Sequence, residues 1–368
     1  MAYIKQLDAI RAFAIFTVIA AHWFPQGSIL KEIGEMFDAP SIFFILSGFL
    51  ITKILLADRT KAERLGYSRR IIFKNFFIKR ILRIFPAYFL LIFLVYVIDT
   101  SKSIDYRYYL TFTSNFHIYE QQSWGPLTHL WSLAVEEQFY LGWPWIILLM
   151  KRKYLPYAII FFILIGIISQ RVLPENDFSQ ILTFTCFDTL GLGALLAWIV
   201  DKNPKSLPKV CSILSVSSIL SFILILINFS VGKYYFLSNR TLMAIIMMWM
   251  LAYFLRQNRN ATGGSLVFTN ERLITIGKVS YGIYLYHNVL PYYTWNVFFR
   301  VNKYLPIPSG LIYNPYLLFI ENLIVLVCIT WLSWKFVEMP IQRLKKYFKN
   351  PGAKLPATVE IQYQTAKV

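Results

Sequence analysis

Arg11 and His22 are the first residues of this sequence whose types and spacing suggest chemistry, because both interrupt an apolar run near the N-terminus. Their separation of 11 residues is a helical rotation of about 1100°, about 20° past three turns, which places both on one face about 16 Å apart. Asp8 lies one turn before Arg11 and can pair with it. An imidazole can act as a general base near neutral pH. The sequence equally allows Arg11 to extend toward lipid headgroups and His22 to lie at an interface.

Other ionisable residues interrupt later apolar runs. Glu136 and Glu137 are adjacent, so on a helix they point about 100° apart and at most one faces a given cavity. The alternative is an interhelical pair that holds a bundle together. His287 ends a tyrosine-rich segment, where a histidine is as often a hydrogen-bonded core residue as a reactive one. Asp188 is a further case. Charges inside a membrane span are costly, so these side chains are expected to face a protein interior or a water-filled cavity.

Two shorter patterns have both a functional and a structural interpretation. Ser47 and Gly48 place a hydroxyl beside a glycine, a pair that in membrane helices usually indicates close packing. Arg80 and Arg83 are one turn apart before Pro86. Paired arginines suit phosphate recognition, but basic residues at the end of a span are also ordinary topology signals.

Several motifs of soluble enzymes are absent from the sequence. There is no GxSxG segment of a serine hydrolase. The four histidines show neither HExxH nor HxxxH spacing, so we expect no metal site; they are His22, His117, His129 and His287. Gly191 and Gly193 lie in an apolar run without the strand–turn–helix context of a dinucleotide site. The sequence predicts no bound cofactor.

The elements that position these residues are predicted to be membrane helices. Of 368 residues 57% are hydrophobic and only 15% are charged, which excludes an ordinary soluble domain. About 20 apolar residues cross a bilayer as a helix, and period-2 alternation is absent. The sequence therefore predicts an all-α polytopic bundle of ten spans: 8–24, 38–56, 85–99, 127–149, 155–173, 180–200, 210–230, 240–255, 279–299 and 313–337.

The distribution of Lys and Arg predicts the orientation of the bundle. The formal net charge is +18. The segment 57–83 between the second and third spans carries nine Lys and Arg residues, and the other basic clusters fall in alternate connections. This asymmetry predicts that both termini are cytoplasmic. We attribute the basic residues to the cytoplasmic side of a membrane protein rather than to nucleic-acid binding. Residues 1–340 are interpreted as the membrane domain and 341–368 as a short basic cytoplasmic tail.

At this point the sequence resembles acyltransferase family 3, integral-membrane enzymes that O-acylate bacterial surface glycans and some small molecules. The resemblance covers about residues 3–340 and is carried by six segments in order: LDAIR at 7–11 followed by His22, FFILSGFLI at 43–51, KRILRIFP at 79–86, HLWSLAVEEQFY at 129–140, SYGIYLYH at 280–287 and FVEMP at 336–340. Some positions differ: Ala9 and Ala12 replace glycines, and Ser41 replaces an Asp, with Asp38 one turn away. The hydrolase-like domain that some members carry is not in this sequence.

The resemblance implies transfer of an acyl group, typically acetyl from acetyl-CoA, to an acceptor hydroxyl in the bacterial cytoplasmic (inner) membrane. It implies that His22 is catalytic, with Arg11 supporting the donor. Glu136 is a candidate to support His22. The expected acyl-CoA-binding residues are Arg80, Arg83, Ser47 and Gly48, and the candidate acceptor or channel residues are His287 and Tyr140. The expected partners are acyl-CoA, the bilayer and a saccharide or glycolipid acceptor.

Physical reasoning agrees with this expectation. Coenzyme A is polyanionic and cytoplasmic, and segment 57–83 offers cations for its phosphates. The pantetheine arm can span the distance from Arg11 to His22, where a neutral imidazole accepts the proton of the acceptor hydroxyl.

The alternative is a transporter or flippase of lipid-linked saccharides, in which Arg11, Glu136 and His287 form a proton relay. Release of CoA from acetyl-CoA separates the two. The sequence leaves open the acceptor and whether the group is acetyl or longer.

Overall fold

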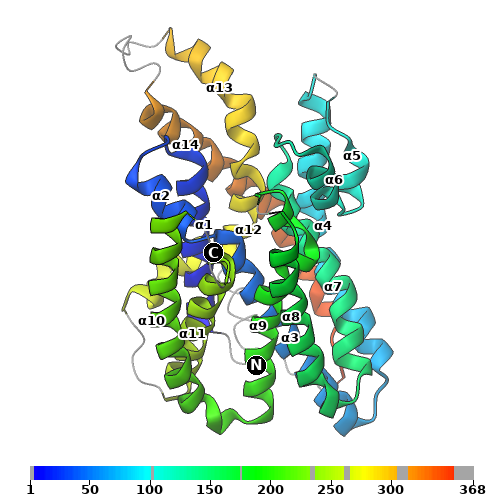
Figure 1. Cartoon of the computed structure of the whole chain (residues 1–368). Helices are drawn as coiled ribbons and strands as arrows, with labels where there is room; N and C mark the ends of the chain where they lie inside the picture. Colours follow the sequence, from blue (N-terminus) through cyan, green and yellow to red (C-terminus); the bar gives the residue numbers. More distant parts are fainter. Residues whose placement is uncertain are drawn as a thin grey trace.

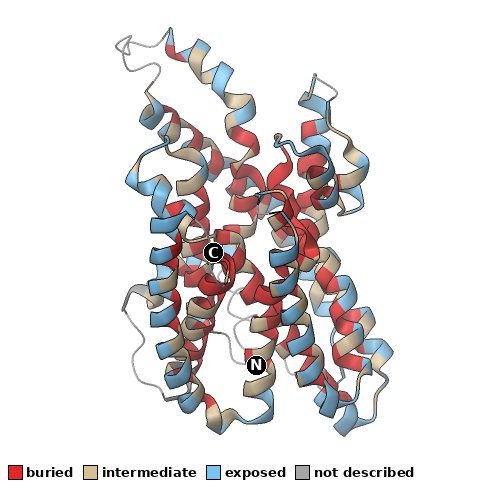
Figure 2. Cartoon of the chain, viewed as in Figure 1, coloured by how far each residue is buried: buried red, intermediate tan, exposed pale blue. Residues whose placement is uncertain are grey.

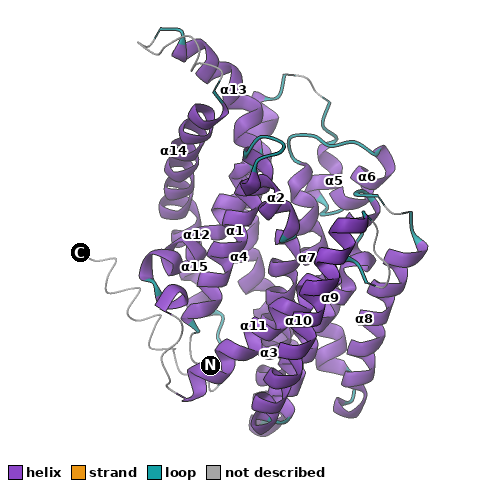
Figure 3. Cartoon of the chain, turned by 60° about the vertical axis from the view of Figure 1, so that its left-hand side comes forward, coloured by secondary structure: helices purple, strands orange, loops and turns teal. Residues whose placement is uncertain are grey.

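Within the described ranges all regular secondary structure is helical, which confirms the predicted all-α class (Figure 3). The structure is a computed structural model that describes residues 4–100, 103–174, 176–232, 237–260, 266–304 and 314–351, without the side chains of 258–260 and 266–267. Most of the predicted tail, residues 352–368, lies outside these ranges.

The α-helices follow the chain in the order labelled in Figure 1. They are α1 Lys5–Trp23, α2 Ile29–Met36, α3 Ala39–Leu65, α4 Arg69–Ile98, α5 Tyr106–Leu110, α6 Ser114–Gln121, α7 Trp131–Leu149, α8 Leu155–Val172, α9 Phe187–Lys202, α10 Leu207–Val231, α11 Asn239–Asn260, α12 Glu271–His287, α13 Val289–Asn302, α14 Pro315–Ser333 and α15 Met339–Arg343. A short 3-10 turn, η1 Thr128–Leu130, precedes α7.

Six stretches of the described chain are long and apolar enough to cross a membrane: Ile29–Leu65, Arg69–Ile98, Arg152–Val172, Thr183–Lys202, Pro204–Val231 and Pro315–Tyr347. They correspond to six of the ten predicted spans. Three further predicted spans, 8–24, 127–149 and 240–255, coincide with α1, α7 and α11, which are helices but do not meet this criterion of length and hydropathy.

The predicted span 279–299 is wrong as a single helix, because α12 ends at His287 and α13 begins at Val289. Pro291 explains the break: it has no N–H to bond the carbonyl of residue 287, four positions earlier. The indole Nε1 of Trp23 donates to that carbonyl instead, at 3.0 Å. The break therefore fixes the end of α1 to the end of α12.

The segment 57–83, interpreted from the sequence as a loop, is mostly helical. α3 continues to Leu65 and ends at Gly66, whose φ of 72° suits a residue without a side chain. α4 begins at once, with the Ser68 side chain capping the N–H of Arg70. Arg80 and Arg83 thus lie in the middle of a 30-residue helix, which fixes their positions relative to its apolar half.

Glycines let the central helices approach backbone to backbone. A Cβ on Gly277 of α12 would lie 1.8 Å from the Asp8 carbonyl oxygen of α1. A Cβ on Gly48 of α3 would lie 1.9 Å from the Leu190 carbonyl oxygen of α9. Small residues at such crossings are typical of membrane helices. These two contacts hold α1 to α12 and α3 to α9.

Burial separates an interior from an outward apolar surface (Figure 2). Trp143 is buried in the interior and donates its indole N–H to Thr52 Oγ1 at 2.7 Å. Large apolar side chains on the outer faces of α4, α8 and α10 are exposed, including Phe93, Phe161 and Ile219. Apolar residues on an outward face fit a lipid environment.

Candidate functional site

His22 lies in the last turn of α1 and is accessible from a cavity of about 750 Å³. α1 stops there because Phe24 takes an extended conformation before Pro25. His129 from η1 and Arg240 from α11 also line this space, which we call the histidine cavity. The predicted imidazole is therefore exposed to a space of the size of a small-molecule site.

Three imidazole rings from three different elements lie together beside this cavity, and those of His22 and His129 line it. The His22 and His287 ring centroids are 5.2 Å apart, with the rings edge to face. His287 and His129 repeat this arrangement at 5.2 Å. His287 and His129 are buried, so His22 is the ring of the three that a ligand in the cavity reaches. Among the described residues no group of three or more His, Cys, Asp or Glu side chains is arranged to hold a metal ion.

Backbone carbonyls fix the tautomers of the two buried rings. His287 Nδ1 lies 2.6 Å from the Tyr284 carbonyl oxygen, and His129 Nε2 lies 3.0 Å from the Leu285 carbonyl oxygen. A carbonyl only accepts, so each of these nitrogens carries the hydrogen and the other ring nitrogen is an acceptor when the ring is neutral. That second nitrogen has no hydrogen-bond partner in the described part of either environment.

A second, smaller cavity of about 90 Å³ contains the predicted cationic residues. Arg11 of α1 and Arg80 and Arg83 of α4 line it together with Ser47 of α3, and we call it the arginine cavity. The predicted pairing of Arg11 with Asp8 is confirmed. The Arg80 guanidinium lies over the Tyr140 ring, 5.1 Å from the centroid.

Glu136 belongs to the arginine cavity rather than to the histidine cluster. Ser47 Oγ donates to Glu136 Oε1 at 2.9 Å, and Tyr140 OH donates to Oε2 at 2.7 Å. Glu137 does not line this cavity, as the angular separation of adjacent helical residues predicts. The ring beside His22 is that of His287. The Glu136 carboxylate, which the sequence suggested as a support for His22, accepts hydrogen bonds from Ser47 and Tyr140 instead.

Gly48 does not line the arginine cavity, although Ser47 does. Its α-carbon faces the backbone of α9, where no ligand atom fits between the helices. Its position indicates helix packing instead of acyl-CoA binding.

Tyr284 lines both cavities. Its hydroxyl donates to the His129 carbonyl oxygen at 2.9 Å and shares a 2.6 Å hydrogen bond with Ser132 Oγ. Arg11 and His22, although on one helix, therefore line different cavities, and Tyr284 is the lining residue that the two cavities share.

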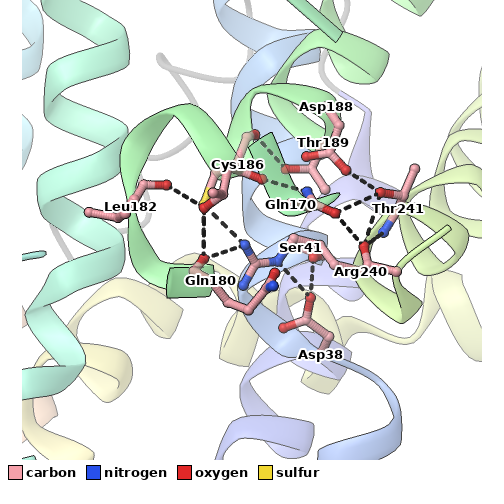
Figure 4. A network of polar contacts seen from close by, with 12 residues as sticks. Asp38, Ser41, Gln170, Gln180, Leu182, Cys186, Asp188, Thr189, Arg240 and Thr241 are labelled. Carbon is pink, nitrogen blue, oxygen red and sulfur yellow. Dashed lines mark hydrogen bonds and ion pairs between the residues drawn. The ribbon is translucent and has the colours of Figure 1, made fainter. Parts of the chain in front are cut away.

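Sequence reasoning missed a buried polar network at the wall of the histidine cavity (Figure 4). Arg240 pairs with Asp38 and donates to the Gln180 carbonyl. Ser41 Oγ donates to the same Asp38 carboxylate, so the serine that replaces an Asp contacts the carboxylate one turn before it. Arg240 carries no distinguishing signal in the sequence, because it is the first residue of a predicted span, where basic residues are common. Its partner residues come from other helices and are not adjacent in sequence.

Asp188 also belongs to this region. It is fully buried in α9 and accepts a hydrogen bond from Thr241 of α11. This places the predicted intramembrane carboxylate in a protein interior, as its cost in lipid requires.

The family model described as "Acyltransferase domain" matches residues 4–337. Peptidoglycan O-acetyltransferase OatA of Listeria monocytogenes is 30% identical over 95% of this chain and 57% of its own length. O-acetyltransferase OatA of Staphylococcus aureus is 28% identical over 94% of this chain and 58% of its own length. The chain thus spans somewhat more than half the length of these relatives. No solved structure matches it.

The matched residues contain both cavities and Tyr284 between them. With the six helices able to cross a bilayer, the comparisons identify a multi-pass membrane protein. Because the family model matches far more than half of the sequence, this chain belongs to that acyltransferase-domain family.

Proposed function

We propose that this chain is a membrane O-acyltransferase that moves an acyl group, typically acetyl, from cytoplasmic acyl-CoA to a hydroxyl of a cell-envelope saccharide. The observation that carries the proposal is the pair of cavities that share Tyr284, with arginines on one side and the accessible imidazole of His22 on the other. The names of the two relatives support O-acetyl transfer, and the name of the Listeria protein supports a saccharide acceptor.

The proposed topology has ten crossings, one of them made by α12 and α13 together, with both termini in the cytoplasm of a bacterium and the chain in its inner membrane. The basic α3–α4 connection and the α9–α10 connection lie at the bottom of Figure 1, whereas α5, α6 and α13 lie at the top. An excess of Lys and Arg marks the cytoplasmic side. In this orientation the arginine cavity of the domain 1–340 opens toward the cytoplasm, and residues 341–368 form a cytoplasmic tail.

Arg80 and Arg83 bind the donor in this proposal. Guanidinium groups form strong, charge-assisted hydrogen bonds with phosphate oxygens. The arginine cavity, at about 90 Å³, is too small for a nucleotide, since small-molecule sites usually hold ~300–1,000 Å³. The nucleotide therefore stays at the cytoplasmic mouth, and only the thin pantetheine arm enters, past Ser47 and Arg11 toward Tyr284.

His22 acts as the general base at the far side of Tyr284. It takes the proton of the acceptor hydroxyl while the hydroxyl oxygen attacks the thioester carbonyl carbon. The C–O bond of the new ester forms, the C–S bond breaks, and the leaving CoA thiolate takes up the proton that His22 holds. The neutral imidazole is the form that accepts this proton.

The test is transfer of radiolabelled acetyl from acetyl-CoA to envelope saccharide in membranes that contain wild type or His22→Ala. Loss of a general base typically reduces the rate by about 10²–10⁴-fold. His22→Gln, which keeps polarity but cannot act as a base near neutral pH, should lose activity equally. Protein level and size-exclusion profile control for folding. A folded His22→Ala protein that transfers acetyl at the wild-type rate would refute the proposal.

The transporter alternative finds less support. Arg11 and Glu136 line the arginine cavity, whereas His287 lies apart from them with the other two histidines. A relay needs groups within hydrogen-bond reach of one another or of bridging water.

A further inference from the structure

A third cavity of about 610 Å³ adjoins the histidine cavity, and we call it the side cavity. Four residues line both: Trp124, Gly125, Thr128 and Tyr292. The space that His22 faces therefore continues past Trp124 and Tyr292 toward α5 and α6. Each cavity alone has the volume of a small-molecule site, which is ~300–1,000 Å³. Two such volumes in series suit an extended ligand better than a single small alcohol.

Trp124 stands at the junction of the two cavities with a rigidly held ring. Its side chain is 47% exposed, and its indole stacks on Phe178 with centroids 4.8 Å apart and 23° between the planes. Thr128 Oγ1 accepts from the Gly125 N–H and donates to the Gly125 carbonyl, at 3.3 and 2.6 Å, which closes the loop that carries the tryptophan. A ring that is fixed before binding loses little entropy on binding.

Phe178 covers one face of the Trp124 indole, and the side chain is partly exposed. Such an indole is suited to one kind of ligand. The face of an aromatic ring is electron-rich and apolar, and it attracts the weakly positive C–H groups of a sugar ring. The hydroxyls of such a sugar point outward, and the side cavity offers amide and hydroxyl partners for them from Gln121 and Ser123.

The charge of the side cavity argues against an anionic ligand. Among its described lining residues there is no Lys or Arg, whereas Asp99 and Asp105 both line it. Arg107, outside the lining, donates to Asp105 at 2.7 Å, and this hydrogen bond lowers the pKa of Asp105 to about 2. The charge of Asp105 is therefore compensated by Arg107, and the described lining of the side cavity offers no Lys or Arg side chain to bind a phosphate or carboxylate group.

We propose that the side cavity is a binding subsite for an uncharged saccharide chain, which continues from the unit acylated at His22 across Trp124. The subsite rests on the proposed function, because that function defines which sugar unit lies at His22. It makes the acceptor a polymer or oligomer and makes Trp124 a residue that determines specificity for chain length.

The experiment measures binding, which does not require turnover, by isothermal titration of purified full-length protein in detergent. The probes are N-acetylglucosamine and its neutral tetramer, chitotetraose. Wild type should bind the tetramer at least tenfold more tightly than the monomer. Trp124→Ala should weaken tetramer binding by about tenfold, the effect of one aromatic contact, while monomer binding is unchanged. Trp124→Phe should restore most of the affinity.

Two controls separate the subsite from its surroundings. Trp295→Ala removes an equally exposed tryptophan of α13 that lines neither cavity and should bind as wild type does. His22→Ala should keep tetramer affinity although it loses transfer. Tetramer binding without any acetyl transfer by wild type would refute the proposed function but not the subsite. Equal affinity for monomer and tetramer, unchanged tetramer binding in Trp124→Ala, or no binding of either probe would overturn the subsite.

Discussion

The imidazole rings of His22 and His287 meet edge to face with their centroids 5.2 Å apart, although the two residues are 265 positions apart in the chain. His287 donates its Nδ1 hydrogen to a backbone carbonyl, so its neutral form presents Nε2 as an acceptor. The ring of His287 packs against the ring of His22 and so restricts its orientation. We therefore propose for His287 the positioning role that the sequence suggested for Glu136.

Replacement of His287 should lower the rate of transfer without weakening donor binding. His287→Gln keeps an N–H for the Tyr284 carbonyl but removes the ring beside His22. We expect kcat to fall about 10–100-fold, as when a partner that orients a functional histidine is removed, with the KM for acetyl-CoA unchanged. His129→Gln, one ring further from His22, should lose less. Equal losses in both variants, or a parallel rise in KM, would indicate a purely structural role.

Arg80 and Arg83 should control the affinity for the donor. Replacement of either by Gln removes a charge-assisted contact worth about 1.5–3 kcal/mol, so the KM for acetyl-CoA should rise about tenfold or more while kcat changes little. Added salt should reduce the difference from wild type. Arg70→Gln is the matched control, because Arg70 is an exposed arginine of the same helix that does not line the cavity. An equal change in that variant would contradict a specific phosphate site.

Tyr284→Phe should weaken the barrier between the two cavities. The change deletes hydrogen bonds to Ser132 and to the His129 carbonyl but keeps the ring. We expect hydrolysis of acetyl-CoA in the absence of acceptor to increase severalfold, since water then reaches the thioester more readily. The measurement is CoA release with a thiol reagent. Tyr286→Phe removes a comparable hydrogen bond, to Ser333, away from both cavities, and should not increase hydrolysis.

Gly48→Ala should reduce stability rather than donor affinity. The added methyl group would lie 1.9 Å from the Leu190 carbonyl oxygen, so α3 and α9 must separate. Overpacking of this kind costs about 1–3 kcal/mol, which thermal unfolding followed by size exclusion detects as a lower Tm. Gly142→Ala is the control, because no atom lies within 4 Å of its added Cβ. A Gly48→Ala protein of normal Tm with a raised KM for acetyl-CoA would restore the original assignment.

Local features of the fold could be predicted where one helix suffices to decide them. The pairing of Asp8 with Arg11 follows from helical spacing. So does the divergence of Glu136 and Glu137, because adjacent residues on any helix point apart. The break after His287 was predictable in principle from Pro291, but an apolar run of normal span length concealed it.

Features that need two or more helices could not be predicted. His129 and His287 lie far apart in the sequence, and their contact depends on how η1 packs against the end of α12. The pairing of Arg240 could not be predicted, because its partner, Asp38, is about two hundred residues away. The role of Gly48 likewise depends on α9, which no local pattern around Gly48 indicates.

The backbone contact at Gly277 has a consequence for how this site can change. α1 and α12 touch there without an intervening side chain, and these are the helices that carry His22 and His287. Mutations elsewhere can reshape the walls of the cavities, but the spacing of the two helices at this crossing is set by main-chain atoms. Any larger residue at position 277 would therefore push apart the two helices that carry His22 and His287.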